Sequence, residues 1–553
     1  MDKKLIIFLL LFSGFYFLYY KFVLQPIEKN QPLKKVTAPA PANEAKKPAA
    51  DAPSPVAPSP AQGATVPAAT TMEPTIERAA RTIHVETPLY LAEFTSKGAL
   101  LTSFRLKKYL DDSGQPLQMV PQEVDLSLRP LKLEFNDAQI TKMANQAVYA
   151  ASTENVSLYG NQNGNLEFTY SDGIHTFRKT LGFRADSYLI DFVIAGQQQG
   201  QQLAPKVTWS PGIETVGSYK KADVLKPSRA IVNTGEEVEH LDPKEEHLKI
   251  GSTVRWAGVE DNYFLAIFIP TNSSAQPTDA FMTRVGEDKK PHRVNVMLAS
   301  QKAEPLNMAL FVGPKDYYIL DQLGMDLNKA VNFGFFWPIT KALFSALRIV
   351  HNFTHNYGWA IVLITILIKI IFTPFTQMSF ASMKKMQQMQ PEMKKIQEKY
   401  GKMKSDDPRK QSMNVEVMAL HKRYGVNPLG GCLPMLLQMP VLFAFYTLLS
   451  NAIELRGAPF ALWLQDLSRP DPIWVTPVLM GITMLLQQKM TPATDPMQKN
   501  MMYIMPVMFT YISLNLPSGL VLYWLLSNVL AIAHQYYFQR QQKNAVPAVV
   551  KVS

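Results

Sequence analysis

One lysine lies inside an apolar segment that is long enough to cross a bilayer. The segment reads YGWAIVLITILIKIIFT from Tyr357 to Thr373, and Lys369 is its single charged residue. A cation inside a spanning helix costs about 2.5 to 3.5 kcal/mol on insertion scales, so it usually faces water, a partner or the interior of a bundle. Thr365 and Thr373 lie four residues on either side of Lys369, which places the three side chains on one helical face. This spacing predicts a helix with a polar side and makes Lys369 the first candidate site residue.

A second interpretation of Lys369 requires no site. The residue lies shortly before Pro374, and a long side chain near the end of a spanning helix can extend its ammonium to the membrane surface. The two flanking threonines favour a solvated groove inside a bundle, but the sequence leaves both interpretations open.

Other polar side chains in the apolar stretches extend the candidate site. Gln438 lies in one later stretch, and Tyr523, Ser527 and Asn528 lie in the last one. In a bilayer such groups seek hydrogen-bond partners. Tyr523 and Ser527 also share a helical face by their i, i+4 spacing. These residues either join helices to each other or, together with Lys369, line one hydrated cavity.

Six apolar stretches predict six transmembrane helices. They are residues 1–24, 355–374, 429–450, 473–489, 501–516 and 518–538. The first is interpreted as an uncleaved signal anchor, because no small-residue cleavage site follows it closely. Lys3 and Lys4 begin the anchor, and the tail at 539–553 is basic, whereas the loop at 451–472 has a net charge of −1. Since positive residues stay inside, both termini and the loop at 490–500 are expected in the cytoplasm and 451–472 on the exported side.

A charged segment, 375–428, separates the second and third predicted helices. It contains eleven basic and five acidic residues, a net charge of +6, which predicts a cytoplasmic position. Met386, Met389 and Met393 recur at helical spacing, and Met413 begins a similar pattern after a break. Two helices with facing apolar seams form an antiparallel hairpin. The methionines either only pack this seam or also offer an adaptable surface to apolar partners.

The first half of the chain has a different character. Residues 25–80 are rich in Pro and Ala and predict a semi-extended tether. Residues 81–320 alternate apolar and polar side chains over short runs separated by turn residues, which predicts an antiparallel β-sandwich. Residues 335–352 have the apolar stripe of a helix in the membrane interface, or of a buried globular helix. The expected fold class is a multi-domain α+β membrane protein.

Several function classes find no support in the sequence. The formal charge of +11 does not indicate nucleic-acid binding, because the basic residues gather where membrane topology places them. Cys432 is the single cysteine, so no disulfide forms within the chain. Glu260, Asp261 and His175 have no companions at metal-ligand or acid-dyad spacing, and no phosphate-binding GxxxxGKS or GxxxxGKT motif occurs. We therefore expect no metal, no cofactor and no enzymatic activity.

Two further alternatives concern the membrane segments. A Ser-Lys protease needs a nucleophile near Lys369, but Ser379 lies beyond Pro374 in a charged segment. A small-molecule transporter usually has repeated halves around a midplane site, and the apolar stretches show no internal repeat. The transporter is the alternative to the function that the following motifs imply.

Five ordered motifs give the C-terminal region a resemblance to a known family. They are NPLGGCLPMLLQMPVLFAFY from Asn427, ELRGAPFALWLQDLS from Glu454, DPIWVTPVLMGITMLLQQKMTP from Asp471, DPMQKNMMYIMPVMFT from Asp495 and LPSGLVLYWLLSN from Leu516. These motifs closely resemble the YidC-type membrane protein insertases, the bacterial branch of the family that includes the mitochondrial and chloroplast insertases. VGPKDY from Val312 and the order of anchor, tether and exported domain resemble the Gram-negative type, which has a large periplasmic domain.

The resemblance implies a five-helix bundle around a hydrophilic groove that opens to the cytoplasm and lipid and is closed toward the periplasm. In that family a positive residue, normally Arg, lies in the groove, and the matching residue here is Lys369. Lysine keeps the charge but lacks the planar, bidentate fork of arginine. Thr365 and Trp524 match other groove positions.

The resemblance also implies a function and a set of partners. A member of this family is expected in the cell inner membrane, where it inserts and helps to fold nascent membrane proteins without hydrolysing nucleotide, alone or with a Sec-type translocon. The cytoplasmic hairpin is expected to recruit nascent chains, ribosomes or targeting factors. Membrane lipids are the remaining expected partners.

Overall fold

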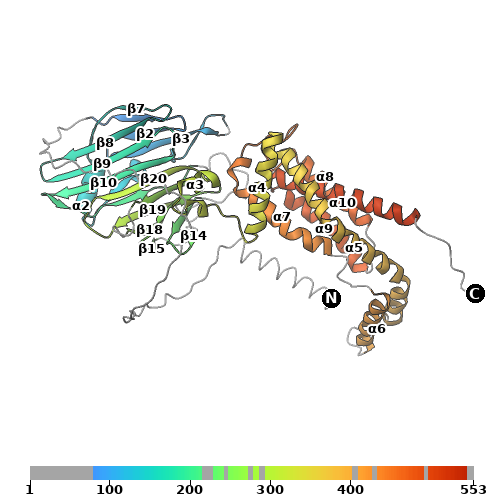
Figure 1. Cartoon of the computed structure of the whole chain (residues 1–553). Coiled ribbons are helices and arrows are strands. Elements are labelled where there is room, and N and C mark those ends of the chain that lie inside the picture. Colours follow the sequence, from blue (N-terminus) through green and yellow to red (C-terminus); the bar gives the residue numbers. More distant parts are fainter. Residues whose placement is uncertain are drawn as a thin grey trace, which may run out of the picture.

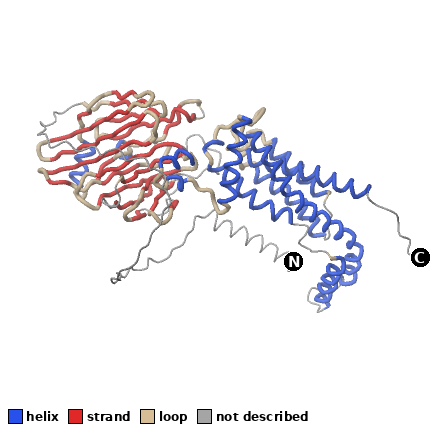
Figure 2. The backbone as a smooth tube through the Cα atoms, in the orientation of Figure 1, coloured by secondary structure: helices blue, strands red, loops and turns tan. Residues whose placement is uncertain are grey.

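The computed structural model describes residues 79–111, 113–214, 228–241, 247–271, 278–285, 293–401, 409–425, 433–490 and 496–544. These residues form a β-rich region followed by a helical region, and the two lie beside each other along the molecule (Figure 1). Figure 2 shows that strands and long helices occupy separate regions. The predicted anchor at 1–24, nearly all of the tether at 25–80 and the last part of the tail, 545–553, lie outside the described residues.

The strands of the β-rich region lie between residues 82 and 314. In chain order they are β1 (Thr82–Glu86), β2 (Tyr90–Thr95), β3 (Leu100–Leu110), β4 (Pro116–Gln118), β5 (Lys132–Glu134), β6 (Ala150–Ala151), β7 (Asn155–Ser157), β8 (Asn163–Ser171), β9 (His175–Arg184), β10 (Leu189–Gln198), β11 (Gln201–Gln202), β12 (Lys206–Trp209), β13 (Arg229–Asn233), β14 (Val238–Leu241), β15 (His247–Gly251), β16 (Trp256–Glu260), β17 (Phe264–Pro270), β18 (Thr278–Val285), β19 (Arg293–Ser300) and β20 (Leu306–Pro314).

These strands form three sheets. A ten-stranded sheet has the order β14-β13-β16-β17-β20-β10-β9-β8-β6, with β11 paired to β10, and two five-stranded sheets have the orders β4-β3-β2-β1-β7 and β15-β18-β19-β12-β5. Within the described strands, neighbours pair antiparallel except β1 and β7, which are parallel. The prediction of a β-rich domain is confirmed, although a simple two-sheet sandwich does not describe it. Sequence alternation reveals which face of a strand is buried, but not which sheet the strand joins.

One core joins the three sheets. Strand β9 alternates buried and half-buried residues along its whole length, whereas every residue of β17 is buried. Alternation indicates a strand with one face on the core, and continuous burial indicates a strand covered on both faces. Side chains from all three sheets belong to a single apolar cluster, in which Trp209 and Trp256 are fully buried.

Helices make up most of the remaining described chain. They are η2 (Leu126–Leu128), α2 (Ala138–Gln146), α3 (Tyr317–Leu323), η3 (Leu327–Ala330), α4 (Trp337–Thr354), α5 (Tyr357–Gly401), α6 (Arg409–Tyr424), α7 (Leu433–Asn451), η5 (Ile453–Leu455), α8 (Val475–Lys489), α9 (Pro496–Ser513) and α10 (Ser518–Asn544). Apolar side chains of α4, α5, α7 and α10 pack into a second cluster.

Helix α5 is longer than the span predicted at 355–374. It continues through Pro374 and Pro391, ends at Gly401 and is 45 residues long. A proline inside a helix removes one backbone hydrogen bond and can be accommodated by a kink, so it does not always end the helix. The first helix of the hairpin is therefore a direct continuation of the helix that carries Lys369.

One helix in the described part of the chain, Tyr357–Tyr400, is long and apolar enough to cross a membrane, and Met502–Ser513 is a shorter apolar helix. Helices α7, α8, α9 and α10 form where the other apolar stretches of the C-terminal half were predicted. The count of six transmembrane helices stays a prediction.

Helix α4 forms at the predicted amphipathic segment, 335–352. Its Leu343 and Leu347 are buried in the second cluster, whereas Ile349 is 60% exposed and Phe353 is 81% exposed. One face of α4 therefore packs on neighbouring helices, and another face carries exposed apolar side chains. That α4 lies in the membrane interface stays a prediction.

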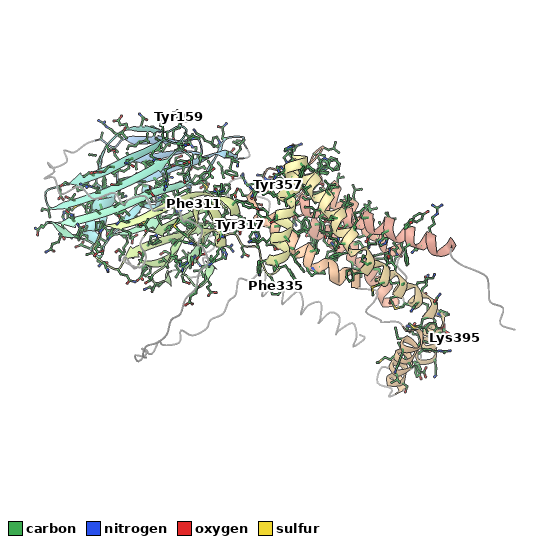
Figure 3. The ribbon with its side chains drawn as sticks, viewed as in Figure 1. Tyr159, Phe311, Tyr317, Phe335, Tyr357 and Lys395 are labelled. Carbon is green, nitrogen blue, oxygen red and sulfur yellow. The ribbon has the colours of Figure 1, made fainter. Side chains whose placement is uncertain are left out.

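An aromatic cluster fills the boundary between the β-rich region and the helices. Tyr317 lies 5.5 Å from Phe333 and 6.3 Å from Phe344 between ring centroids, and the two phenylalanines lie 5.9 Å apart. Figure 3 labels Tyr317, Phe335 and Tyr357 along this boundary. The two regions thus meet through packed side chains.

A buried lysine connects separate segments of the β-rich region. Lys179 on β9 has no exposed surface, and its Nζ donates hydrogen bonds to the carbonyls of Gly98 at 2.8 Å, Ala99 at 3.0 Å and Leu131 at 2.7 Å. These three residues have φ angles of 71°, 48° and 70°, and positive φ is uncommon for alanine and leucine. The ammonium thus provides donors for carbonyls that these turns direct into the core.

We expect Lys179→Met to lower the free energy of unfolding of the β-rich region by about 2 to 4 kcal/mol, because three buried carbonyls lose their donor. Denaturant unfolding followed by tryptophan fluorescence measures the change. Lys142→Met alters an exposed lysine on α2 and should change stability by less than about 0.5 kcal/mol. Identical unfolding curves for the two variants would contradict a stabilising role for the buried ammonium.

Candidate functional site

Three polar side chains that lie far apart in the sequence meet inside the helical region. The Lys369 ammonium on α5 donates to Oε1 of Gln438 on α7 at 3.4 Å. The Gln438 amide nitrogen in turn donates to the hydroxyl of Tyr523 on α10. These contacts define a polar chain, Lys369–Gln438–Tyr523, that joins three helices.

The neighbours of this polar chain are mainly apolar. Tyr523 has no exposed surface, and its ring stacks on Phe445 with centroids 4.3 Å apart. Ser527, one turn along α10, is 3% exposed. Lys369 and Gln438 are half-buried. The charged end of the polar chain is therefore its more accessible end.

The contact with Gln438 bears on the two interpretations of Lys369. Extension of the ammonium to the membrane surface requires the spanning segment to end near Pro374, whereas the helix itself continues beyond that residue to Gly401. The ammonium contacts a neighbouring helix, α7. This geometry favours a position inside the bundle.

The two flanking threonines do not extend the polar chain. The Thr365 hydroxyl donates to the Ile361 carbonyl at 2.6 Å, and the Thr373 hydroxyl donates to the Lys369 carbonyl at 2.8 Å. Both bonds return to the backbone one turn earlier, a common pattern for threonine in helices. Thr365 is also fully buried. Of the three residues in the predicted polar stripe, Lys369 is therefore the one whose side chain donates to another helix.

Two other predicted site residues on α10 contact different helices. The Asn528 amide donates to the Thr483 hydroxyl on α8 at 3.4 Å. The Trp524 ring packs edge-on against Phe509 on α9, with centroids 5.0 Å apart. Sequence reasoning missed Thr483, although a polar residue in an apolar stretch is the signal that could have identified it. The predicted site residues therefore fall into two groups. Gln438 and Tyr523 join Lys369 in the polar chain, whereas Asn528 contacts α8 and Trp524 contacts α9.

The hairpin has the predicted apolar seam. Met389 and Met393 on α5 are buried against Leu420 on α6, and Met386 packs at the edge of this cluster. Met413 is half-buried and is not a member of it. The apolar pattern of the sequence was therefore a better guide for α5 than for the start of α6.

Polar contacts also bind the two hairpin helices together. Glu416 accepts hydrogen bonds from Lys399 at 2.7 Å and from the Tyr400 hydroxyl at 2.8 Å. The hydrogen bond from Lys399, together with the weaker effect of that from Tyr400, holds the pKa of Glu416 below its usual range.

Within the described ranges, no group of three or more His, Cys, Asp or Glu residues is placed to hold a metal ion.

Comparisons with known proteins cover nearly the whole chain. The family described as YidC periplasmic domain matches residues 82–346, and the family described as 60Kd inner membrane protein matches residues 349–545. The membrane protein insertase YidC of Citrifermentans bemidjiense is 37% identical over 475 residues, which cover 83% of this chain and 86% of that protein. Its counterpart from Syntrophus aciditrophicus is 36% identical over 573 residues, which cover 98% of this chain and 100% of that protein.

Together, the β-rich region, the apolar helices and the family matches define an inner-membrane protein with a periplasmic domain and a helical membrane region. More specifically, the chain belongs to the YidC membrane protein insertase family. The small-molecule transporter is not favoured, because the relatives that match along the chain are named insertases.

The polar chain predicts energetic coupling between Gln438 and Tyr523. We expect Gln438→Leu and Tyr523→Phe each to lower the stability of the helical region by about 1 to 2 kcal/mol, and the double variant to lower it by little more, because either change breaks the same connection. Unfolding of the full chain in detergent micelles measures the three values. Gln438→Leu combined with Thr483→Val is the control pair, and its effects should add, since Thr483 bonds Asn528. Additive effects in the first pair would contradict the coupling.

Proposed function

We propose that this chain inserts nascent inner-membrane proteins through a hydrated groove between its helices and assists their folding. The observation that carries the proposal is the polar chain, in which the half-buried Lys369 ammonium contacts Gln438 among apolar helices. A charge at such a position is costly for a bundle that only has to be stable. It is useful where a polar segment of another protein must enter the bilayer.

The physical role of the groove is to shorten the apolar path. Water and polar side chains replace lipid around the segment being moved, which lowers the cost of desolvating its polar groups. Lys369 attracts acidic residues of that segment. The apolar segment of the client then leaves sideways into lipid, and its transfer, at about 0.8 kcal/mol per buried CH₂, drives insertion without nucleotide hydrolysis. The membrane potential assists segments with acidic residues.

The proposed groove needs a defined orientation in the membrane. The anchor at 1–24 and five further transmembrane helices hold both termini and the hairpin at 375–428 in the cytoplasm, with 81–320 and the loop at 451–472 in the periplasm. The position of α6 at the far end of the helical region from the strands supports this orientation (Figure 1). Alternation of basic and acidic loops supports it independently.

The hairpin is the proposed recruitment surface. Its seam is packed, but Val415 and Met418 on α6 are 67% and 72% exposed, and the surrounding segment carries a net charge of +6. Exposed apolar side chains among cations suit the apolar segments of nascent chains and the acidic surfaces of ribosomes or targeting factors. A Sec-type translocon is the proposed partner for larger clients, and lipids surround the bundle.

We expect the charge of Lys369 to set the rate for clients with acidic translocated tails. Lys369→Met should slow their insertion about tenfold, equivalent to a loss of about 1.4 kcal/mol, because the attraction in a poorly solvated groove is lost. Lys369→Glu should slow it further through repulsion, and Lys369→Arg should retain or raise the rate through bidentate contact. Insertion of single-span clients into proteoliposomes measures these rates.

The control distinguishes charge from folding. Clients with amides in place of the tail carboxylates should be inserted at similar rates by the wild-type chain and by the Lys369→Met variant. Lys489→Met, at an exposed position of α8, should have no effect on either kind of client. Normal insertion of acidic-tailed clients by Lys369→Glu would rule out the proposed charge role.

Crosslinking tests where the client lies. Photoreactive residues at positions 369 and 524 should crosslink to a stalled nascent membrane protein. Position 365 should crosslink weakly, because Thr365 is fully buried. Position 529 is the comparison, since Val529 is 44% exposed on another part of α10. Equal yields at all four positions would indicate client contact with the outside of the bundle rather than with a groove.

A further inference from the structure

One short helix belongs to both regions of the molecule. η5 follows α7 in the chain, yet its Ile453 packs in the core of the β-rich region, where it is 2% exposed. Leu455, two residues later, packs in the cluster formed by the long helices. Neighbouring apolar side chains of η5 therefore join the two cores.

Polar contacts on both sides of η5 strengthen this connection. The Arg456 guanidinium donates to the Leu110 carbonyl at 3.1 Å, and its Cζ lies 5.4 Å from the centroid of the Phe264 ring. Before η5, the Asn451 amide donates to the Asn332 carbonyl at 3.1 Å. Residues 451–456 thus contact β3, β17 and the segment that precedes α4.

The carboxylate of Glu454 lies within this connection. Glu454 is half-buried and lines a small cavity between the two regions with Lys315, Phe344 and Thr447. The Lys315 ammonium is engaged elsewhere, since it donates to the buried Glu260 carboxylate at 2.6 Å. A negative charge on Glu454 is consequently poorly solvated when the two regions are joined.

Charged and titratable groups from several elements act on Glu454. They are Lys108 and Tyr109 on β3, Asp316 before α3, Arg348 on α4 and Tyr357 at the start of α5. Burial raises the pKa of Glu454 to about 7, and the Asp316 carboxylate adds to this shift. A hydrogen bond from the Glu454 backbone amide and the cations of Arg348 and Lys108 oppose it.

We propose that residues 451–456 form a proton-sensitive clasp between the β-rich region and the helices, and that the clasp closes more tightly when Glu454 is protonated. This inference goes beyond the proposed insertase function, because it concerns how the two regions are held together and requires no client. Protonation removes the poorly solvated charge from the cavity while leaving Ile453 and Arg456 in place.

The direction of the pH dependence follows from proton binding. In the open clasp Glu454 is in water and titrates near its ordinary value of 4.5, whereas in the closed clasp it keeps its proton up to about pH 7. Between these values the closed state binds more protons, so closure weakens as the pH rises and then stays constant above about pH 7. From pH 5 to pH 8 the closing constant should fall by about seventyfold.

Hydrogen exchange of the full chain in detergent micelles measures this opening. The amides of Leu455 and Arg456 donate to the carbonyls of Ala452 and Ile453 at 3.2 and 3.1 Å, so they exchange when the clasp opens. After correction for the intrinsic pH dependence of exchange, their protection should fall by about seventyfold between pH 5 and pH 8. Peptides from β10 provide the internal reference for global stability.

Three variants assign the titrating group. Glu454→Gln should give a flat profile at the protected, acidic level. Glu304→Gln, at an exposed position, should retain the wild-type profile. His351→Gln should also retain it, which separates Glu454 from a histidine that stacks on Tyr357 at 3.9 Å.

A flat wild-type profile would overturn the proposal, and so would a sloping profile in Glu454→Gln with intact β10 protection. Should Glu454→Gln lose β10 protection, the wild-type profile decides alone: a fall between about pH 4.5 and 7 that His351→Gln retains supports the clasp, and its absence refutes it. Lys369→Met should leave the pH profile of hydrogen exchange unchanged. The insertion assay and the exchange profile therefore test the proposed groove and the proposed clasp independently.

Discussion

A cation inside an apolar helix bundle needs a polar partner or water, and this constraint organises the helical region. The Lys369 ammonium meets Gln438, and Gln438 meets Tyr523, so α5, α7 and α10 must approach one another at these residues. Stacking of Tyr523 on Phe445 fixes the buried end of this polar chain. The position of a single charge therefore constrains three helices that are distant in the sequence.

Two ammonium groups in the described part of the chain, one fully buried and one half-buried, have different surroundings. Lys179 has no exposed surface and donates to three carbonyls at 2.7 to 3.0 Å, which uses all of its donors. Lys369 is half-buried, and in the described structure its hydrogen bond is a single long one to Gln438. The first arrangement suits a permanent structural role. The second leaves donors available, which the proposed transient binding of acidic client residues requires.

Sequence patterns identified the elements better than their connections. Alternation over residues 81–320 correctly predicted β-strands, of which β9 shows a single buried face. The spacing of Met386, Met389 and Met393 correctly predicted an apolar seam. Pairing of strands into three sheets depends on contacts between distant residues, which local patterns do not encode. Pro374 suggested a boundary, but tertiary packing and the tolerance of helices for a kink allowed α5 to continue.

The candidate site was predictable in its charges and less so in its hydrogen bonds. Lys369 is conspicuous in any apolar stretch, whereas the return of the Thr365 hydroxyl to the backbone is visible only in three dimensions. Ile453 is a stronger example, because nothing in its local sequence indicates that it packs with the strands rather than with the neighbouring helices.

The unbroken course of α5 has a structural consequence. At about 1.5 Å per residue, its 45 residues have a contour length of about 67 Å, and the helix starts beside the β-rich region and ends in the hairpin. Lys369 lies on this helix between the two ends. The hairpin and the ammonium are therefore connected through one continuous helix that contains Pro374 and Pro391, and no loop lies between them.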